Sequence, residues 1–497
     1  MQYVLGIDLG TSSVKAMLVS SDGKITGQHA MGYEPDFGGN GFVEQQPSVW
    51  WENTKAAIKT VVNQSGVDAG DIAALSCSGQ MHSSVFLDTS GEVIRPAILW
   101  NDTRTTKQVR AVYESAGEEC ILENVQNHVF EGFTLPKILW LRDNEPENFK
   151  KVSKVIMPKD YINYKLTGNI FTDYSDAAGT SLFDVKARKW SEAMITEVGL
   201  DAGILPEAVE STAVVGMVSA DVAAELGLSV ATKVIAGGAD NSCAAIGNGV
   251  VSKGQAIISV GTSGTVVAFL DKMPDTTSGD VHLFNYSYPG SFYAMGCMLS
   301  AGESLNWLRR NVFTDCTFEE LTDMAANASV GSGGLLFLPY LFGERCPYNN
   351  ANARGVFFGL SSVTKRAELA RAVFEGVAFN IRAMLELVLD FTDINSLYIT
   401  GGGAKSTLWG QIIADTLDRE LLVLESSEGP GYGAAMIALV GSGITADFGA
   451  ANNTSAKPER TIKPNKENHR VYNKYFEIFE EIYKANKNIF KKLNGSF

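Results

Sequence analysis

The chain has 497 residues, of which 45% are hydrophobic, enough for two to four domains with sizeable cores. Its formal net charge is -15, from 56 acidic and 41 basic residues, and no run of lysines or arginines is long enough to follow a polyanion. Nucleic acid and anionic membranes are therefore not expected as partners.

The six cysteines are scattered and form no CxxC pair, which is typical of reduced thiols in a cytosol and argues against structural zinc. The first residues enter an apolar strand without the basic segment and apolar core of a secretory signal. No apolar run reaches membrane-spanning length. We therefore expect a soluble, cytoplasmic protein.

Residues 3–19 predict a β-hairpin whose tip, Gly10 to Ser13, offers hydroxyls and backbone N–H groups with little side-chain bulk. Such a concavity suits phosphate oxygens. Asp8 adds a carboxylate beside it, as expected where a partly hydrated Mg²⁺ lies between a carboxylate and a phosphate. An ordinary polar hairpin turn would use the same residue types.

The hairpin pattern occurs a second time from Ile258, where VGTSG repeats the LGTSS of the first copy. Gly10 and Gly261 head the two tips and lie about half a chain apart. A single duplication of this kind predicts two related α/β domains, 1–248 and 249–497. Each domain would offer one phosphate loop to the same nucleotide.

Two predicted strands of the first half end in polar side chains. Residues 72–78 form a strand followed by Met81 and His82, and ligands of α/β folds usually bind at such strand ends. A lone histidine is nevertheless more often structural. After a short apolar run, Asp102 and its neighbours could bind sugar hydroxyls or cap the next helix.

Asp240 lies at a predicted strand-to-helix turn, in the sequence GGADN. The positive end of the helix dipole is expected to favour its ionised form. A plain helix N-cap is the alternative. The two glycines before Asp240 favour a binding site, because they remove side chains where a substrate must approach closely.

Glycine turns recur in the second half. A predicted strand at 397–400 ends in three glycines before a helix, so that a flat or phosphorylated group could lie against the backbone. Gly429, Gly431 and Gly433 are expected to repeat this turn before another helix. Near the C-terminus, apolar residues follow one face of a helix, which packs on the body of the protein or on the partner subunit of a homodimer.

Two phosphate loops, Asp8 as a metal carboxylate and Asp240 as a second carboxylate describe a phosphoryl-transfer site. The sequence contains neither a Walker A motif nor the protein-kinase signatures. Asp240 is the candidate base. Even with a pKa of about 4 it could accept the hydroxyl proton late in the reaction.

A resemblance supports this interpretation. The segments DLGTSSVK, GQMH, WND, SDAAGT, GGADN, VGTSG, GER, GVFFGL and GGGAKS follow one another over nearly the whole chain and resemble the FGGY carbohydrate kinases. Each motif is weak alone, but the ordered set is specific. The resemblance implies two actin-like, ribonuclease-H-like domains with ATP and sugar in the cleft between them. It also implies Mg²⁺-assisted transfer from ATP to D-xylulose, giving D-xylulose 5-phosphate.

Carried over by position, the resemblance makes Asp240 the base and Asp8 the carboxylate linked to the metal. The positions that match its sugar contacts are Met81 and His82, with Asp102 and Asn241 as polar neighbours. The positions that match its ATP contacts are Thr11, Ser12 and Lys15 in the first loop, Thr262 in the second, and Gly402, Gly403 and Lys405 on the adenosine side.

Departures from the family pattern leave parts of this assignment open. Ser83 stands where glycine is usual and is expected to tighten the sugar pocket. Gly431 and Tyr432 stand where alanine and leucine are commoner, which leaves the adenine contacts open.

Two other functions stay open. One is a kinase for another ketose or polyol, such as ribulose, fuculose, glycerol or erythritol. The other is an actin-like clamp that closes on ATP without sugar kinase activity. Asp240 separates the clamp from a kinase, because a clamp needs no base aimed at a sugar hydroxyl.

Overall fold

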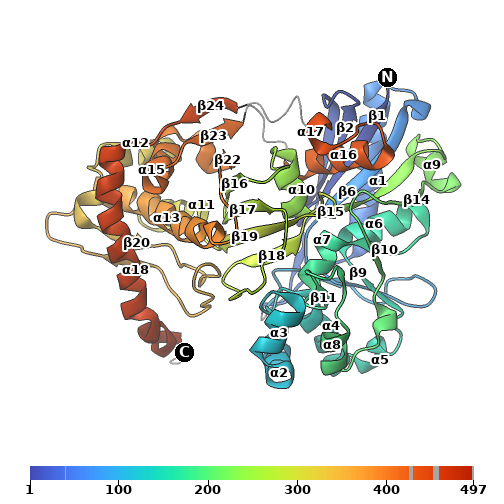
Figure 1. Cartoon of the computed structure of the whole chain (residues 1–497), viewed down its shortest axis with the longest axis horizontal. Coiled ribbons are helices and arrows are strands. Elements are labelled where there is room, and N and C mark those ends of the chain that lie inside the picture. Colours follow the sequence, from blue (N-terminus) through green and yellow to red (C-terminus); the bar gives the residue numbers. More distant parts are fainter. Residues whose placement is uncertain (40, 425–428, 452–457, 495–497) are drawn as a thin grey trace.

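The computed structural model describes residues 1–39, 41–424, 429–451 and 458–494. Two α/β lobes lie side by side, with the start of the chain in the lobe on the right of Figure 1 and most of its second half in the lobe on the left. A six-stranded sheet forms the first lobe and a seven-stranded sheet the second. The two-lobed α/β fold expected from the repeated hairpin is thus confirmed, while the boundary between residues 248 and 249 stays a prediction.

The first sheet has the predicted hairpin at its centre. Its strands, in spatial order, are β14 (Val214–Met217), β15 (Lys233–Ala239), β6 (Ile72–Gly79), β1 (Tyr3–Leu9), β2 (Ser13–Ser20) and β3 (Ile25–Gly32). β1, β2 and β3 pair antiparallel, whereas β6 runs parallel to both β1 and β15. The ends of β1, β6 and β15 therefore meet at one rim.

The second sheet repeats this order. Its strands are β18 (His282–Asn285), β19 (Phe292–Met298), β17 (Gly264–Leu270), β16 (Gln255–Val260), β22 (Ser396–Thr400), β23 (Leu421–Leu424) and β24 (Pro458–Ile462). β16 and β17 form the second hairpin, and β16, β22 and β23 run parallel. Strands β19-β17-β16-β22-β23 thus correspond to β3-β2-β1-β6-β15, as a duplication predicts.

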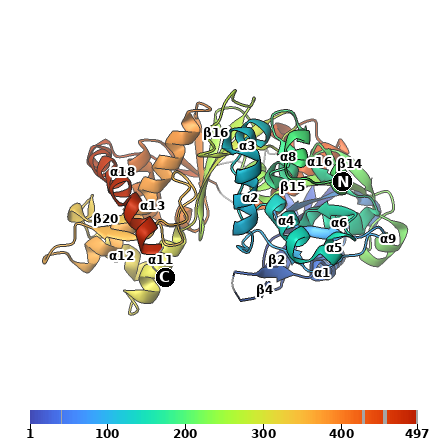
Figure 2. The same ribbon diagram turned by 90° about the horizontal axis from the view of Figure 1, so that it is seen from below.

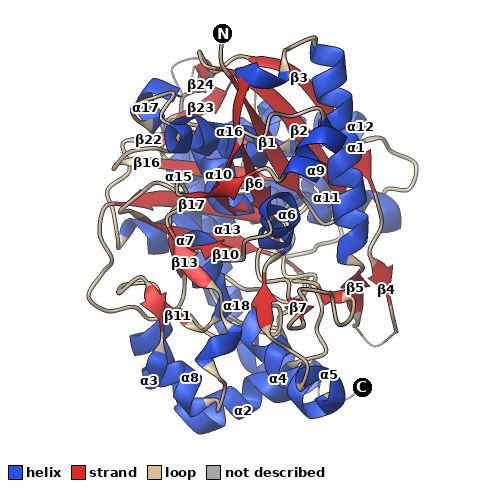
Figure 3. Cartoon of the chain, turned by 90° about the vertical axis from the view of Figure 1, so that its right-hand side faces the viewer, coloured by secondary structure: helices blue, strands red, loops and turns tan. Residues whose placement is uncertain are grey.

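Helices cover both faces of the first sheet because alternate residues of a strand point to opposite faces. Leu5 and Ile7 of β1 join a core with α1 (Pro47–Ser65) and α6 (Pro158–Thr167). Val4 joins the core on the opposite face, with residues of α10 (Asp240–Gly247) and α16 (Gly429–Ser442). Figure 3 shows α1, α6 and α9 (Ala220–Leu226) in front of the sheet.

Helix α16 crosses from the second half of the chain onto the first sheet, beside β1 and β2 in Figure 1. This helix begins at Gly429, whose φ is 64°, so Gly431 and Gly433, which were predicted in a turn before the helix, lie inside it. A Cβ on Gly433 would overlap the carbonyl oxygen of Cys243 on α10, and one on Gly6 would overlap that of Gly431. These glycines serve close packing.

Tyr432 also belongs to this packing. Its side chain is buried, and its hydroxyl donates to the carbonyl oxygen of Gly23 at 2.8 Å. The hydroxyl of Tyr432 thus contacts the first lobe, and the adenine contacts stay open.

The second lobe is organised around α13 (Arg366–Leu389), which packs on β17, β19, β20 (Leu336–Leu338) and α15 (Thr407–Leu417). The C-terminal helix, α18 (Lys466–Asn494), packs on α15 and β20. Of the two options from the sequence, packing on the body is the one observed. In Figure 2, α13 and α18 lie on one lobe, and α1, α4 (Thr134–Asn144) and α6 on the other.

Shorter elements complete the described chain. The remaining strands are β4 (Asp36–Phe37), β5 (Val43–Gln45), β7 (Val85–Leu87), β8 (Ala97–Ile98), β9 (Lys154–Ile156), β10 (Phe171–Asp173), β11 (Phe183–Asp184), β12 (Lys189–Trp190), β13 (Glu207–Val209) and β21 (Val356–Phe358). The remaining helices are α2 (Thr106–Ala116), α3 (Glu118–Val125), α5 (Pro146–Phe149), α7 (Tyr174–Ala177), α8 (Glu192–Glu197), α11 (Gly302–Asn311), α12 (Phe318–Ala326), α14 (Gly402–Lys405) and α17 (Phe448–Ala451). None of the helices in the described ranges is long and apolar enough to cross a lipid bilayer.

Candidate active site

Three parallel strands of the first sheet bring the predicted polar residues to one rim. Asp8 is near the end of β1, Met81 and His82 follow β6, and Asp240 follows β15. β6 lies between the other two strands. The rim formed by the carboxyl ends of parallel strands is where α/β folds bind ligands. Residues far apart in the sequence thus form one candidate site.

Asp240 is close enough to Asp8 to influence its titration. Burial, with the field of Asp240 added, raises the pKa of Asp8 to about 7, and Lys15 opposes this shift. Lys15 pairs with Asp8 across the β1–β2 hairpin. Two carboxylates at one rim repel each other, so the site favours a cation or a shared proton.

Burial also raises the pKa of Asp240, to about 6. Asn241 opposes the shift, because its backbone N–H and its Nδ2 both donate to Asp240 Oδ1, at 2.7 and 2.9 Å. The helix start was expected to favour the ionised form, but burial outweighs it, and the pKa of Asp240 lies above the ordinary aspartate value. The carboxylate is still mostly ionised at neutral pH.

His82 is neutral and has a defined tautomer. Burial lowers its pKa to about 3. Nδ1 lies 2.7 Å from the carbonyl oxygen of Gly179, which can only accept, so Nδ1 carries the proton. Nε2 is then a hydrogen-bond acceptor. Met81 is buried beside it, with its sulfur 3.7 Å from Asn241 Nδ2.

Asp102 is occupied by structural partners. Its Oδ2 accepts the backbone N–H of Val43 at 2.6 Å, and both carboxylate oxygens accept from Arg104. The N-cap of α2 is Thr105, so the alternative that Asp102 caps this helix is wrong. A contact between Asp102 and a sugar stays a prediction.

Ser83 does not tighten a pocket. It is fully buried, and its hydroxyl accepts the backbone N–H of Trp100 at 3.0 Å and donates to Gln80 Oε1 at 3.1 Å. Trp100 in turn donates from Nε1 to the hydroxyl of Thr11 at 2.9 Å. The sequence prediction did not single out this contact of Trp100, although Trp100 opens the WND motif.

Each loop tip is closed by a hydrogen bond from the N–H group of its glycine. Gly10 N–H donates to the carbonyl oxygen of Ser13 at 2.9 Å, and Gly261 N–H to that of Ser263 at 3.0 Å. Ser12 and Thr262 are exposed at these tips. Both loops can thus present hydroxyls to a ligand.

A cavity of about 400 Å³ adjoins the second loop. Three of the predicted ATP-binding residues, Thr262, Gly402 and Gly403, line it. Its apolar wall, which the sequence prediction missed, consists of Leu305, Phe318, Phe374 and Trp409. A flat apolar wall facing glycines suits an aromatic base. Lys405 lies instead in a neighbouring cavity of about 460 Å³, with Arg460.

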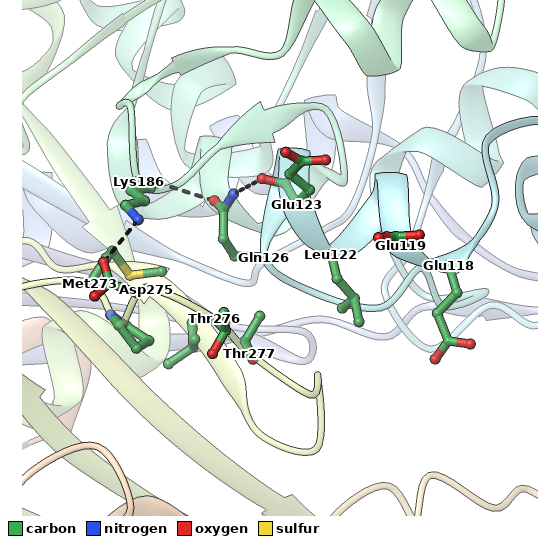
Figure 4. Close-up of a pocket in the computed structure, with 12 residues that line it drawn as sticks. Glu118, Glu119, Leu122, Glu123, Gln126, Lys186, Met273, Asp275, Thr276 and Thr277 are labelled. Atoms are coloured by element: carbon green, nitrogen blue, oxygen red, sulfur yellow. Dashed lines mark hydrogen bonds and ion pairs between the residues drawn. The ribbon is translucent and has the colours of Figure 1, made fainter.

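A larger cavity, of about 890 Å³, lies between α3 and residues 273–277 (Figure 4). Glu118, Glu119 and Glu123 line its α3 side, and Lys186 there pairs with Asp275. None of the predicted site residues lines this cavity. Its carboxylates would repel phosphate groups, so size alone does not make it the nucleotide site.

Within the described ranges, no group of three or more His, Cys, Asp and Glu side chains could hold a metal ion. A Mg²⁺ ion that binds together with a nucleotide needs fewer protein ligands, because one or two carboxylates, water and phosphate oxygens complete its coordination. Asp8 and Asp240, which repel each other at the same rim, fit this requirement.

Comparison with known proteins agrees with the geometry. Models for the N-terminal and C-terminal domains of the FGGY family of carbohydrate kinases match residues 3–247 and 256–442. The xylulose kinase of Bacillus subtilis (strain 168) is 40% identical over 490 residues, 98% of each chain. A solved xyloylose kinase from Brucella ovis is 35% identical with a TM-score of 0.92, covering 98% of this chain and 100% of its own. A solved gluconate kinase from Lactobacillus acidophilus is 27% identical with a TM-score of 0.94, covering 99% of both chains.

Proposed function

The chain belongs to the FGGY family of carbohydrate kinases, and from this premise we propose that it transfers the γ-phosphoryl group of ATP to D-xylulose. The product is D-xylulose 5-phosphate. The observation that carries this proposal is the common rim of β1, β6 and β15, which joins a candidate base to candidate sugar contacts and a phosphate loop.

The choice of sugar rests on the sequence relatives, because the fold does not distinguish substrates. The Bacillus subtilis protein, 40% identical over nearly the full length of both chains, is a xylulose kinase. The gluconate kinase has a TM-score of 0.94 but only 27% identity. D-Xylulose is therefore the first candidate, and gluconate belongs in any substrate panel.

In this proposal Asp240 is the general base. As the sugar O5 attacks the γ-phosphorus, Asp240 accepts the O5 proton, and the electron pair of that O–H bond stays on O5. The bond between the γ-phosphorus and the bridging oxygen breaks, and its electron pair leaves with ADP. A pKa of about 6 suits this role, because general bases work best with a pKa near the operating pH.

Asp8 would hold a Mg²⁺ ion delivered with ATP. Bound there, the ion would neutralise charge on the phosphate oxygens. Lys15, paired with Asp8 across the hairpin, would add positive charge on the same side. Thr11 and Ser12 of the first loop complete the phosphate contacts in this proposal.

The sugar and the adenosine would bind on opposite sides of this centre. Met81, the neutral His82 and Asn241 would contact the ketose, with His82 Nε2 accepting from a sugar hydroxyl. Thr262, Gly402 and Gly403 would contact the nucleotide across the cavity of about 400 Å³. Lys405 would reach it from the neighbouring cavity.

We further propose that the enzyme works in the cytoplasm. Its six cysteines are all free thiols, and its second substrate is ATP. A homodimer stays a prediction, which light scattering after size-exclusion chromatography would test.

The test is ADP release with MgATP against D-xylulose, D-ribulose, L-fuculose, gluconate, glycerol and erythritol. Strong turnover of D-xylulose alone supports the proposal. Turnover of another compound alone would replace the substrate and keep the reaction class. ATP binding by a folded protein that phosphorylates none of them would contradict a sugar kinase and favour a nucleotide clamp.

A further inference from the structure

His82 is held in a backbone conformation that residues other than glycine rarely adopt. Its φ angle is 67°, in the left-handed region. Its ring stacks on Phe133, with centroids 4.1 Å apart and planes at 11°. Gly179 accepts from its Nδ1, and a Cβ on Gly179 would lie only 2.7 Å from that nitrogen. Such a conformation persists only where surrounding contacts determine it.

The start of α4 supplies two donors to the backbone carbonyl of His82. Thr134 Oγ1 and Lys137 Nζ each lie 3.0 Å from this oxygen. Residues three apart in a helix share one face, so both donors come from the same side of α4. Phe133 is the N-cap of this helix. One helix start therefore contacts both the ring and the carbonyl of His82.

Lys137 is fully buried, and the charges that act on it oppose each other, since Asp102 favours its protonated form and Arg104 disfavours it. Its Nζ donates to the carbonyl oxygens of His82 and Gly132, the latter at 2.6 Å, and within the described part of the chain it has no ion pair. Burying a cation without a partner is costly, and burial lowers the pKa of Lys137 well below its usual value. An apolar side chain would fill the same space at less cost. The hydrogen bonds of the amine are therefore its distinctive contribution.

We propose that Lys137, together with Thr134, is a positioning residue that holds His82 in the left-handed conformation needed to contact the sugar. This inference rests on the proposed function, since His82 contacts a sugar only there. Lys137 acts through His82 and touches neither sugar nor ATP. Loss of its amine therefore weakens sugar binding and leaves ATP use unchanged.

Lys137→Met keeps most of the aliphatic stem and removes the donor. We expect the KM for D-xylulose to rise about tenfold, while the KM for ATP stays within about twofold of wild type. Lys154→Met is the matched control. Lys154 also donates to two backbone carbonyls, those of Gly203 and Leu205 at 2.8 and 3.0 Å, but it lies on β9, away from His82. The control is expected to keep the wild-type KM for both substrates.

Thr134 provides a second test if Lys137→Met fails to fold. Thr134→Val removes the other donor with little change in shape and should raise the KM for the sugar. Thr134→Ser keeps the hydroxyl and should have the wild-type KM for the sugar. In a His82→Ala background, neither removal should raise the sugar KM further, because the residue being positioned is gone. An unchanged sugar KM in both variants, with a lowered Tm, would show a purely structural role and overturn the proposal.

Imidazole ¹⁵N spectra give a readout independent of turnover. The chain has five histidines, so selective labelling and a His82→Ala spectrum assign the signal of His82. In wild type and in Lys154→Met we expect a fixed tautomer protonated at Nδ1. In Lys137→Met we expect the two nitrogen signals to average as the ring loses its fixed position. A fixed tautomer in Lys137→Met would overturn the proposal. If the wild type phosphorylates no sugar, the proposed function fails, and these spectra alone decide the inference.

Discussion

The indole Nε1 of Trp100 donates a hydrogen bond to the hydroxyl of Thr11 at 2.9 Å. This contact ties the first phosphate loop to the chain segment after β8. The hydroxyl of Ser83 accepts a hydrogen bond from the backbone N–H of Trp100. In the proposed function, the nucleotide and sugar sides of the rim are thus joined through one residue, Trp100. Changes on one side are expected to affect the other.

Trp100→Phe tests this connection. The change keeps an aromatic ring and removes the donor to Thr11, whose hydroxyl then loses its fixed orientation. We expect the KM for ATP to rise about three- to tenfold, the equivalent of one neutral hydrogen bond. Trp190→Phe is the control, because its Nε1 donates to the carbonyl oxygen of Pro206 at 2.8 Å. If the KM for ATP were equal in Trp100→Phe and Trp190→Phe, the connection between Trp100 and Thr11 would be contradicted.

The activity is expected to depend on pH through Asp240. Its pKa is raised to about 6, so below this pH the carboxyl already holds a proton and cannot accept another from the sugar. With saturating Mg²⁺, a bound cation lowers the pKa of Asp8 and leaves Asp240 as the group that titrates. The measured kcat/KM for D-xylulose should rise up to about pH 6 and then level off. An acid limb centred at about pH 4 would show that burial does not control this carboxylate.

Asp8→Asn should separate metal binding from stability. The pKa of Asp8 is about 7 in the folded protein against a usual value of 3.8, so its ionisation on raising the pH costs folding free energy. Without Mg²⁺, the variant should be more stable than wild type by about 1–3 kcal/mol at pH 8, and by less at pH 5.

Differential scanning fluorimetry at both pH values, with and without MgADP, measures these differences. MgADP should raise the Tm of wild type more than that of Asp8→Asn. A variant that loses stability without Mg²⁺ would contradict the raised pKa of Asp8.

Gly433→Ala tests the close packing of α16 on α10. A methyl group there would overlap the carbonyl oxygen of Cys243, so the helices must separate. We expect a loss of about 1–3 kcal/mol in the free energy of unfolding and a lower Tm. Gly70→Ala is the control, since a Cβ there meets no atom within 4 Å. A Tm equal to that of the control would contradict the packing role.

Strand ends and repeated hairpins could be predicted from the sequence because they depend on local patterns. Asp8 and Asp240 each follow an apolar run, and parallel strands bring such ends together. The packing glycines of α16 could not be predicted in this way. Gly433 looks like a turn glycine in the sequence, and only the approach of α10 gives it a different role.

Tertiary contacts also explain the other errors. Ser83 was expected in the sugar pocket, but its hydroxyl is used by Trp100 and Gln80. The pKa of Asp240 depends on how deeply the rim is enclosed, which no local pattern reveals. The conformation of His82 likewise depends on α4, which begins about fifty residues later in the chain.

The most direct test of the account compares Asp240→Asn with wild type in D-xylulose phosphorylation. Asp221→Asn, at an exposed position on α9, is the control. Loss of a general base typically costs 10²–10⁴-fold, so we expect kcat to fall by about that factor in Asp240→Asn, with D-xylulose still bound in calorimetry. Wild-type kcat is expected in Asp221→Asn. A kcat for Asp240→Asn within about threefold of wild type would contradict the assignment of Asp240 as the base.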